Sequence, residues 1–147
     1  MGNITNSRTL TAENLLRLPS PIILLCPQRL DFEKAILDTG SHKVSLNLLL
    51  AKALIGKTEK ERLTGITAAV LGLMPNEAAV YLTDYEMLFD PRYKLDVIKL
   101  FCEISRKAKL ILKWCGGFNN GRLTYAEPDC DDYSDYKISD YKITCVI

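Results

Sequence analysis

The sequence has little of what a metal site or a thiol enzyme requires. It contains one histidine, His42, and its five cysteines form no C-x-x-C pair. Structural zinc sites use cysteines and histidines at short spacing, and a thiol nucleophile needs a histidine beside it, so both kinds of site are disfavoured. The odd number and wide spacing of the cysteines favour reduced thiols and a cytoplasmic protein. No apolar run approaches the ~20 residues that cross a bilayer, so no membrane is expected as a partner.

A strong net charge is also missing. The 147 residues carry 19 basic and 18 acidic side chains, which gives a net charge of +1. The charge is uneven along the chain, because residues 91–113 hold seven basic and two acidic side chains whereas residues 126–147 hold two basic and six acidic ones. Lys99, Arg106 and Lys107 are therefore candidates for a DNA or partner surface. Their acidic neighbours predict at most weak DNA binding by the isolated protein.

Hydrophobic patterning predicts an α/β fold. Apolar runs that suit strands buried on both faces alternate with helical segments at least three times, which is typical of a parallel sheet flanked by helices. We expect one domain over residues 1–147, with a mostly parallel sheet of about five strands. Residues 1–10 are expected to form a flexible arm, and residues 118–147 a strand-rich C-terminal extension of the sheet.

One apolar run ends in acidic residues. It extends from Ala78 to Leu82, and Asp84 and Glu86 follow it. A buried strand that delivers a carboxylate to a sheet edge is typical of the Walker B element, in which the carboxylate binds Mg²⁺ beside a nucleotide. Asp84 is therefore the candidate metal ligand, and Glu86 the candidate residue for orienting a water molecule. Polar strand ends are common in α/β proteins, so a purely structural interpretation stays open.

The glycine-rich loop that accompanies such a strand in nucleotide-binding proteins is missing. A P-loop has the pattern G-x-x-x-x-G-K-[ST] after the first strand, but residues 22–26 run into Pro27, Gln28 and Arg29 without a glycine. These three residues are the candidate nucleotide-binding positions of a degenerate loop, where Arg29 could meet an anion at the strand end. An ordinary strand-to-helix turn is the alternative. The Gly-Lys-Thr string at residues 56–58 follows a helix and is better explained as a helix stop and a helix cap.

Several segments carry a family resemblance. They are DYEMLFDP at 84–91, LDVIKL at 95–100 with Ser105 and Arg106, Trp114 and Gly116, GRLTYAEP at 121–128, and, more loosely, SLNLLLAKAL at 45–54. With these segments the chain resembles BrxF, the small P-loop-containing protein of type 3 BREX phage-defence systems. The GRLTYAEP string is the most specific of them.

The resemblance implies a P-loop NTPase-like scaffold in a cytoplasmic accessory subunit, with other BREX proteins as partners. The glycine-free loop departs from the family's pattern, so we expect a non-catalytic or weakly nucleotide-binding protein that acts through protein contacts. Two alternatives stay open. One is an active NTPase with an atypical phosphate loop, which would use ATP and Mg²⁺, and the other is an accessory protein that contacts DNA.

Overall fold

A six-stranded parallel sheet forms the centre of the protein. The computed structural model describes residues 2–26, 28–76 and 78–147. Across the sheet, the strands lie in the order β1 (Asn3–Thr5), β9 (Thr144–Val146), β2 (Ile22–Leu24), β5 (Lys109–Lys113), β4 (Ala79–Thr83) and β3 (His42–Ser45). All five neighbouring pairs are parallel. The expected α/β fold is thus confirmed, with six strands where about five were expected.

Helices cover both faces of the sheet. The helices are α1 (Ala12–Leu15), α2 (Leu30–Asp38), α3 (Leu46–Leu54), α4 (Glu59–Leu73) and α5 (Val97–Ile104). Because side chains alternate along a strand, Leu110 and Leu112 of β5 join the core that contains α3, α4 and α5, whereas Ile111 joins the core that contains α1 and α2. The apolar runs in the sequence therefore correspond to strands buried on both faces.

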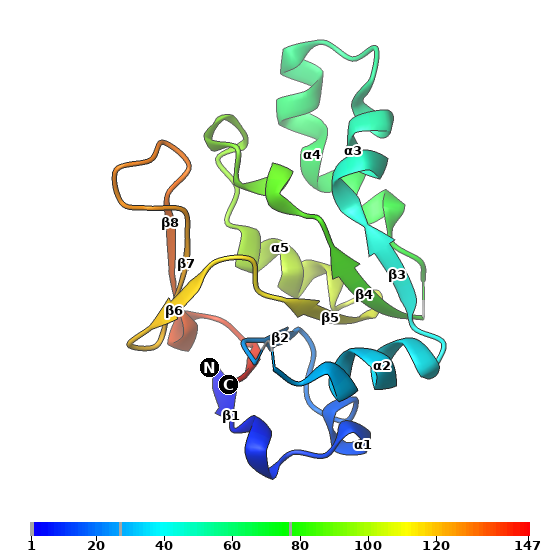
Figure 1. Ribbon diagram of the computed structural model, residues 1–147. Helices are drawn as coiled ribbons and strands as arrows, with labels where there is room; N and C mark the ends of the chain where they lie inside the picture. The colour runs from blue at the N-terminus through cyan, green and yellow to red at the C-terminus, as the bar shows by residue number, and fades with distance from the viewer. Residues whose placement is uncertain (1, 27, 77) are drawn as a thin grey trace.

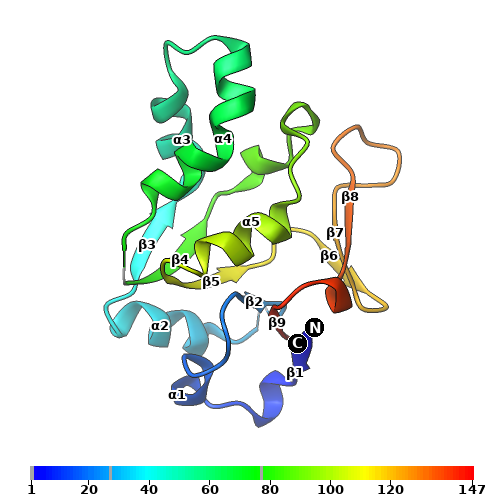
Figure 2. The same ribbon diagram turned by 180° about the vertical axis from the view of Figure 1, so that it is seen from behind.

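Helices α3 and α4 form a hairpin that stands away from the sheet (Figures 1 and 2). A capping box fixes the start of α4: the Glu61 amide donates to Thr58 Oγ1 over 3.2 Å, and the Thr58 amide donates to Glu61 Oε1 over 3.2 Å. These two hydrogen bonds give partners to two backbone amides that the start of a helix would otherwise leave unpaired. Residues 56–58 therefore follow the end of one helix and cap the start of the next, as the sequence analysis predicted for the Gly-Lys-Thr string.

The C-terminal region does not simply extend the main sheet, which corrects the expectation for residues 118–147. Strands β6 (Gly117–Asn119), β7 (Arg122–Tyr125) and β8 (Ser134–Lys137) form a separate antiparallel sheet, and β9 alone of this region joins the main sheet. The separate sheet still belongs to the fold, because Leu123 and Tyr136 are buried in the larger core. An antiparallel hairpin needs only a tight turn, which residues 120–121 supply with positive φ angles.

The N-terminal ten residues are not simply an arm, which corrects the second expectation. Strand β1 pairs with β9, and the 3₁₀ helix η1 (Ser7–Thr9) follows it. The Arg29 side chain holds this segment by donating to the carbonyl oxygens of Ser7 and Leu10. The first and last described strands of the chain, β1 and β9, therefore lie side by side (Figure 2). No helix in the described part of the chain is long and apolar enough to cross a membrane.

Candidate functional site

The candidate acidic residues lie where two neighbouring strands end. In the parallel pair β3–β4, Ser45 lies opposite Thr83, and both strands end at these residues. Asp84 follows β4 directly, and Glu86 opens the 3₁₀ helix η2 (Glu86–Phe89). Ligands of open α/β sheets bind at the carboxyl ends of the strands, so this is the edge at which a site is expected.

Hydrogen bonds from neighbouring residues hold Asp84 at this edge. Its Oδ2 atom accepts a hydrogen bond of 2.5 Å from Ser45 Oγ, and its carbonyl oxygen accepts one of 2.6 Å from the Asn47 amide. The backbone of Asp84 has φ of 50°, a left-handed conformation that few residues other than glycine adopt and that asparagine and aspartate tolerate better than most. The carboxylate is exposed to solvent and is positioned by contacts within the protein.

Glu86 is held by the same neighbouring element. Asn47 Nδ2 donates to Glu86 Oε2 over 3.0 Å, and Asn47 Oδ1 accepts from the Met87 amide over 3.0 Å. One amide side chain at the start of α3 therefore satisfies both the carboxylate and the first turn of η2. The structure brings Asp84 and Glu86 to one edge, as the sequence predicted, and adds Ser45 and Asn47, which the sequence analysis missed.

Tyr85, between the two acids, turns inward. It is 2% exposed, and its hydroxyl donates to the Lys113 carbonyl oxygen over 2.6 Å and accepts from the Cys115 amide over 3.0 Å. Burial raises the pKa of this hydroxyl well above its usual value. Tyr85 thus ties the end of β4 to the end of β5.

The position of the missing phosphate loop is filled by internal contacts. Of the three candidate residues, Pro27 lies outside the described residues and Gln28 is exposed. The Arg29 guanidinium donates to both carboxylate oxygens of Asp31 over 2.9 and 2.8 Å, and it lies 3.8 Å from the centre of the Phe32 ring. This pairing lowers the pKa of the Asp31 carboxyl. Together with its bonds to the N-terminal segment, these contacts leave Arg29 engaged as a structural residue.

The described residues do not fit ATP and Mg²⁺ in the manner of a P-loop. Such a loop cradles phosphates with closely approaching backbone amides and a lysine, whereas no glycine lies between residues 22 and 39. Arg29 already has acidic and carbonyl partners. No group of three or more His, Cys, Asp or Glu side chains in the described ranges is arranged to hold a metal ion. We therefore derive no chemical step through these cofactors.

The candidate basic residues differ in their environments. Lys99 lies exposed on α5, and Arg106 lies exposed just beyond its end. Lys107 Nζ donates to the Leu71 carbonyl oxygen of α4 over 3.0 Å, so this amino group stabilises the packing of two elements. Lys109, another basic residue of the segment 91–113, donates to the Leu16 carbonyl oxygen on the opposite face of the sheet.

Comparisons with family models, curated proteins and solved structures find no match to this chain.

Three of the segments singled out in the sequence, 84–91, 114–116 and 121–128, meet in one aromatic cluster. The Phe89 and Tyr125 rings stack with their centres 3.9 Å apart, and the Trp114 ring meets Phe89 edge-on at 5.8 Å. Trp114 Nε1 donates to the Thr124 carbonyl oxygen over 3.0 Å. A Cβ atom on Gly116 would lie 1.9 Å from that same oxygen, so only glycine fits there. These contacts dock the small antiparallel sheet onto the end of the main sheet.

Proposed function

We propose that this protein is a BrxF-like accessory subunit of a bacterial BREX phage-defence system. It acts through contacts with other proteins of that system rather than by hydrolysing a nucleotide. The absence of nucleotide hydrolysis is supported by Arg29, which is engaged in internal contacts at the strand end where a phosphate loop would begin. The assignment to a BREX system is supported by the segments that resemble BrxF.

The acidic edge is consistent with a structural role. Asp84 and Glu86 each accept a hydrogen bond from α3 or the residue before it, and these bonds fasten the α3–α4 hairpin to the end of β4. In an NTPase the same carboxylates would instead bind Mg²⁺ and orient water. The active NTPase is the alternative that this edge leaves open, because both carboxylates are exposed.

The test is complementation of a type 3 BREX system from which the equivalent subunit has been deleted, measured by phage plating. The wild-type chain is expected to restore resistance. The variant Asp84→Asn is expected to restore it equally, because the amide oxygen still accepts the bond from Ser45. The matched control changes one exposed acid near the opposite face, Asp38→Asn, far along the chain from the acidic edge.

Two results would contradict the proposal. If the wild-type chain restored no resistance and did not co-purify with any co-expressed BREX protein, the assignment to that system would be wrong. If only Asp84→Asn lost resistance while keeping its melting temperature, the Asp84 carboxylate would be catalytic and the NTPase alternative would replace the accessory role.

A further inference from the structure

A groove runs beside the acidic edge. Two hollows of about 260 and 560 Å³ share Arg62, Met87 and Tyr93 in their walls and so adjoin each other. The first lies under the turn between α3 and α4, and the second lies against η2, the 3₁₀ helix η3 (Pro91–Tyr93) and the loop between β7 and β8. We call this continuous feature the hairpin groove.

One end of the hairpin groove is largely apolar, although Lys57 and Arg62 also line it. Ala51, Leu54 and Ile55 line it from α3 and the residue after it, and Met87 and Tyr93 line it from the facing 3₁₀ helices. Ile55 is 81% exposed. An apolar side chain of a partner would cover this surface and remove it from water.

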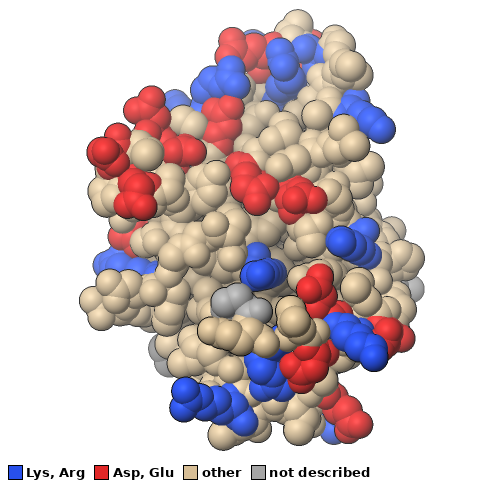
Figure 3. All heavy atoms as spheres, in the orientation of Figure 1, with Lys and Arg blue, Asp and Glu red and all other residues tan. Residues whose placement is uncertain are grey.

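The other end is acidic. Glu86, Asp131 and Asp132 line it, and none of these three described residues forms an ion pair. In Figure 3, acidic side chains gather over the loop between β7 and β8. Arg62 and Arg92 also line this end, but Arg92 pairs with Asp90 and Glu59. Three carboxylates therefore remain against one arginine, Arg62, and this end keeps a net negative charge.

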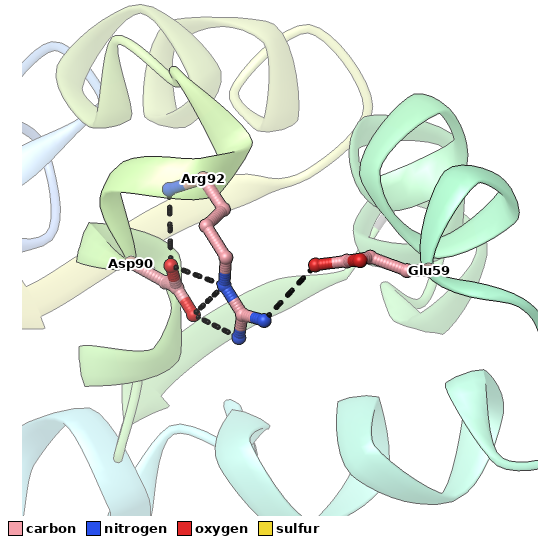
Figure 4. Close-up of polar contacts among 3 residues, drawn as sticks. All are labelled: Glu59, Asp90 and Arg92. Carbon is pink, nitrogen blue, oxygen red and sulfur yellow. Dashed lines mark hydrogen bonds and ion pairs between the residues drawn. The ribbon is translucent and has the colours of Figure 1, made fainter.

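The one arginine of η3 does not neutralise this end. Arg92 donates to Asp90 over 2.7 Å and to Glu59 over 3.3 Å, and so joins η3 to the start of α4 (Figure 4). The hydrogen bonds from the Arg92 guanidinium lower the pKa of the Asp90 carboxyl. The arginine is thus shared by two acids of its own chain, and it fixes the wall of the groove.

We propose that the hairpin groove binds a segment of a partner protein that carries apolar side chains at one end and lysine or arginine side chains at the other. The apolar end selects the first part and the unpaired carboxylates select the second, because charge complementarity suppresses partners of the wrong sign. This inference rests on the proposed function, which requires a protein partner. Nucleic acid does not fit the groove, since its phosphates would meet carboxylates.

The test uses two fluorescent synthetic peptides of about 12 residues, a length that reaches ~40 Å when extended. One has a leucine-rich half and a lysine-rich half, and the other replaces every lysine with glutamate. Anisotropy titrations at about 150 mM salt screen distant surface charges. The basic peptide is expected to bind at least about tenfold more tightly than the acidic one.

Matched variants separate the groove from the general charge of the loop. Asp131→Lys with Asp132→Lys is expected to weaken binding of the basic peptide at least about tenfold. Glu127→Lys with Asp129→Lys makes the same charge change in the same loop, outside the groove, and is expected to weaken it less than about threefold. Ile55→Ser tests the apolar end and is expected to weaken both peptides. Melting temperatures check that each variant folds.

Equal binding of the two peptides, or equal losses in the two double variants, would overturn the inference. Self-association of the chain that disappears in the Asp131→Lys, Asp132→Lys variant would also overturn it, in favour of a contact between two copies. If this double variant restores phage resistance as well as the wild type does, the groove inference fails while the proposed function stands. If the wild type restores nothing, the proposed function itself fails.

Discussion

Replacing Tyr85 with phenylalanine tests how the acidic edge is held. The change removes one hydroxyl and keeps the ring, which packs edge-on against Phe101 with centres 5.4 Å apart. Two hydrogen bonds disappear, one to the Lys113 carbonyl oxygen and one from the Cys115 amide. Each such bond contributes a net ~0.5–1.5 kcal/mol to stability. We therefore expect the free energy of unfolding to fall by about 2 kcal/mol.

The measurement is equilibrium unfolding in urea. Trp114 is the sole tryptophan, and its ring centre lies 6.5 Å from that of Tyr85, so its fluorescence reports on this region directly. Circular dichroism on the same samples reports on the whole fold, and coincident transitions justify a two-state treatment. The slope of the transition should stay unchanged, because the variant exposes the same surface on unfolding.

Tyr81→Phe is the matched control. Tyr81 is also buried, at 3% exposure, but it packs in the other core, and its hydroxyl makes no hydrogen bond with any described residue. Its loss should change stability by less than about 0.5 kcal/mol. If the two variants lose the same amount, or if Tyr85→Phe loses less than about 0.5 kcal/mol, the hydroxyl does not fasten β4 to β5 and the reasoning is wrong.

Three further predictions concern two glycines, Arg29 and two of the thiols. Gly116→Ala should lower the free energy of unfolding by about 1–3 kcal/mol, because the added methyl group would overpack against the backbone of β7. Gly65→Ala, in the uncrowded middle of α4, should raise it by about 0.5–1 kcal/mol. Thermal melts of the two variants compare these effects. Arg29→Ala should lower the melting temperature, and an unchanged value would refute its structural role. In thiol labelling near pH 8 followed by mass spectrometry, Cys130 should react before Cys115. Both residues are exposed, but desolvation of the Cys115 thiol raises its pKa to about 11. Equal rates would contradict this assignment.

Local patterns predicted the elements whose causes are local. The capping box at Thr58 and Glu61 places the start of α4 correctly, and the apolar run before Asp84 corresponds to β4. The meeting of Asp84 and Glu86 at one sheet edge also follows from the strand pattern. Their partners Ser45 and Asn47 lie 39 positions away in the chain, and no local rule brings them there.

Other features depend on contacts that the sequence does not display. The pentapeptide SDYKI occurs twice in succession, at 134–138 and 139–143. The first copy contains β8, whereas the second begins in the 3₁₀ helix η4 (Ile138–Asp140). Identical local preferences thus give different structures, because only the first copy has β7 beside it. Strand β1 was missed for a related reason, since three residues carry no recognisable pattern and need β9 as a partner.

The most direct measurement of the central claim is a calorimetric titration of the full chain with ATP and Mg²⁺. Because the strand end lacks a glycine-rich loop and Arg29 is engaged within the fold, we predict no saturable heat of binding at millimolar nucleotide. The Asp84→Ala variant should behave like the wild type. A dissociation constant in the low micromolar range that is lost in Asp84→Ala would contradict the account, and it would show that the acidic edge serves a nucleotide.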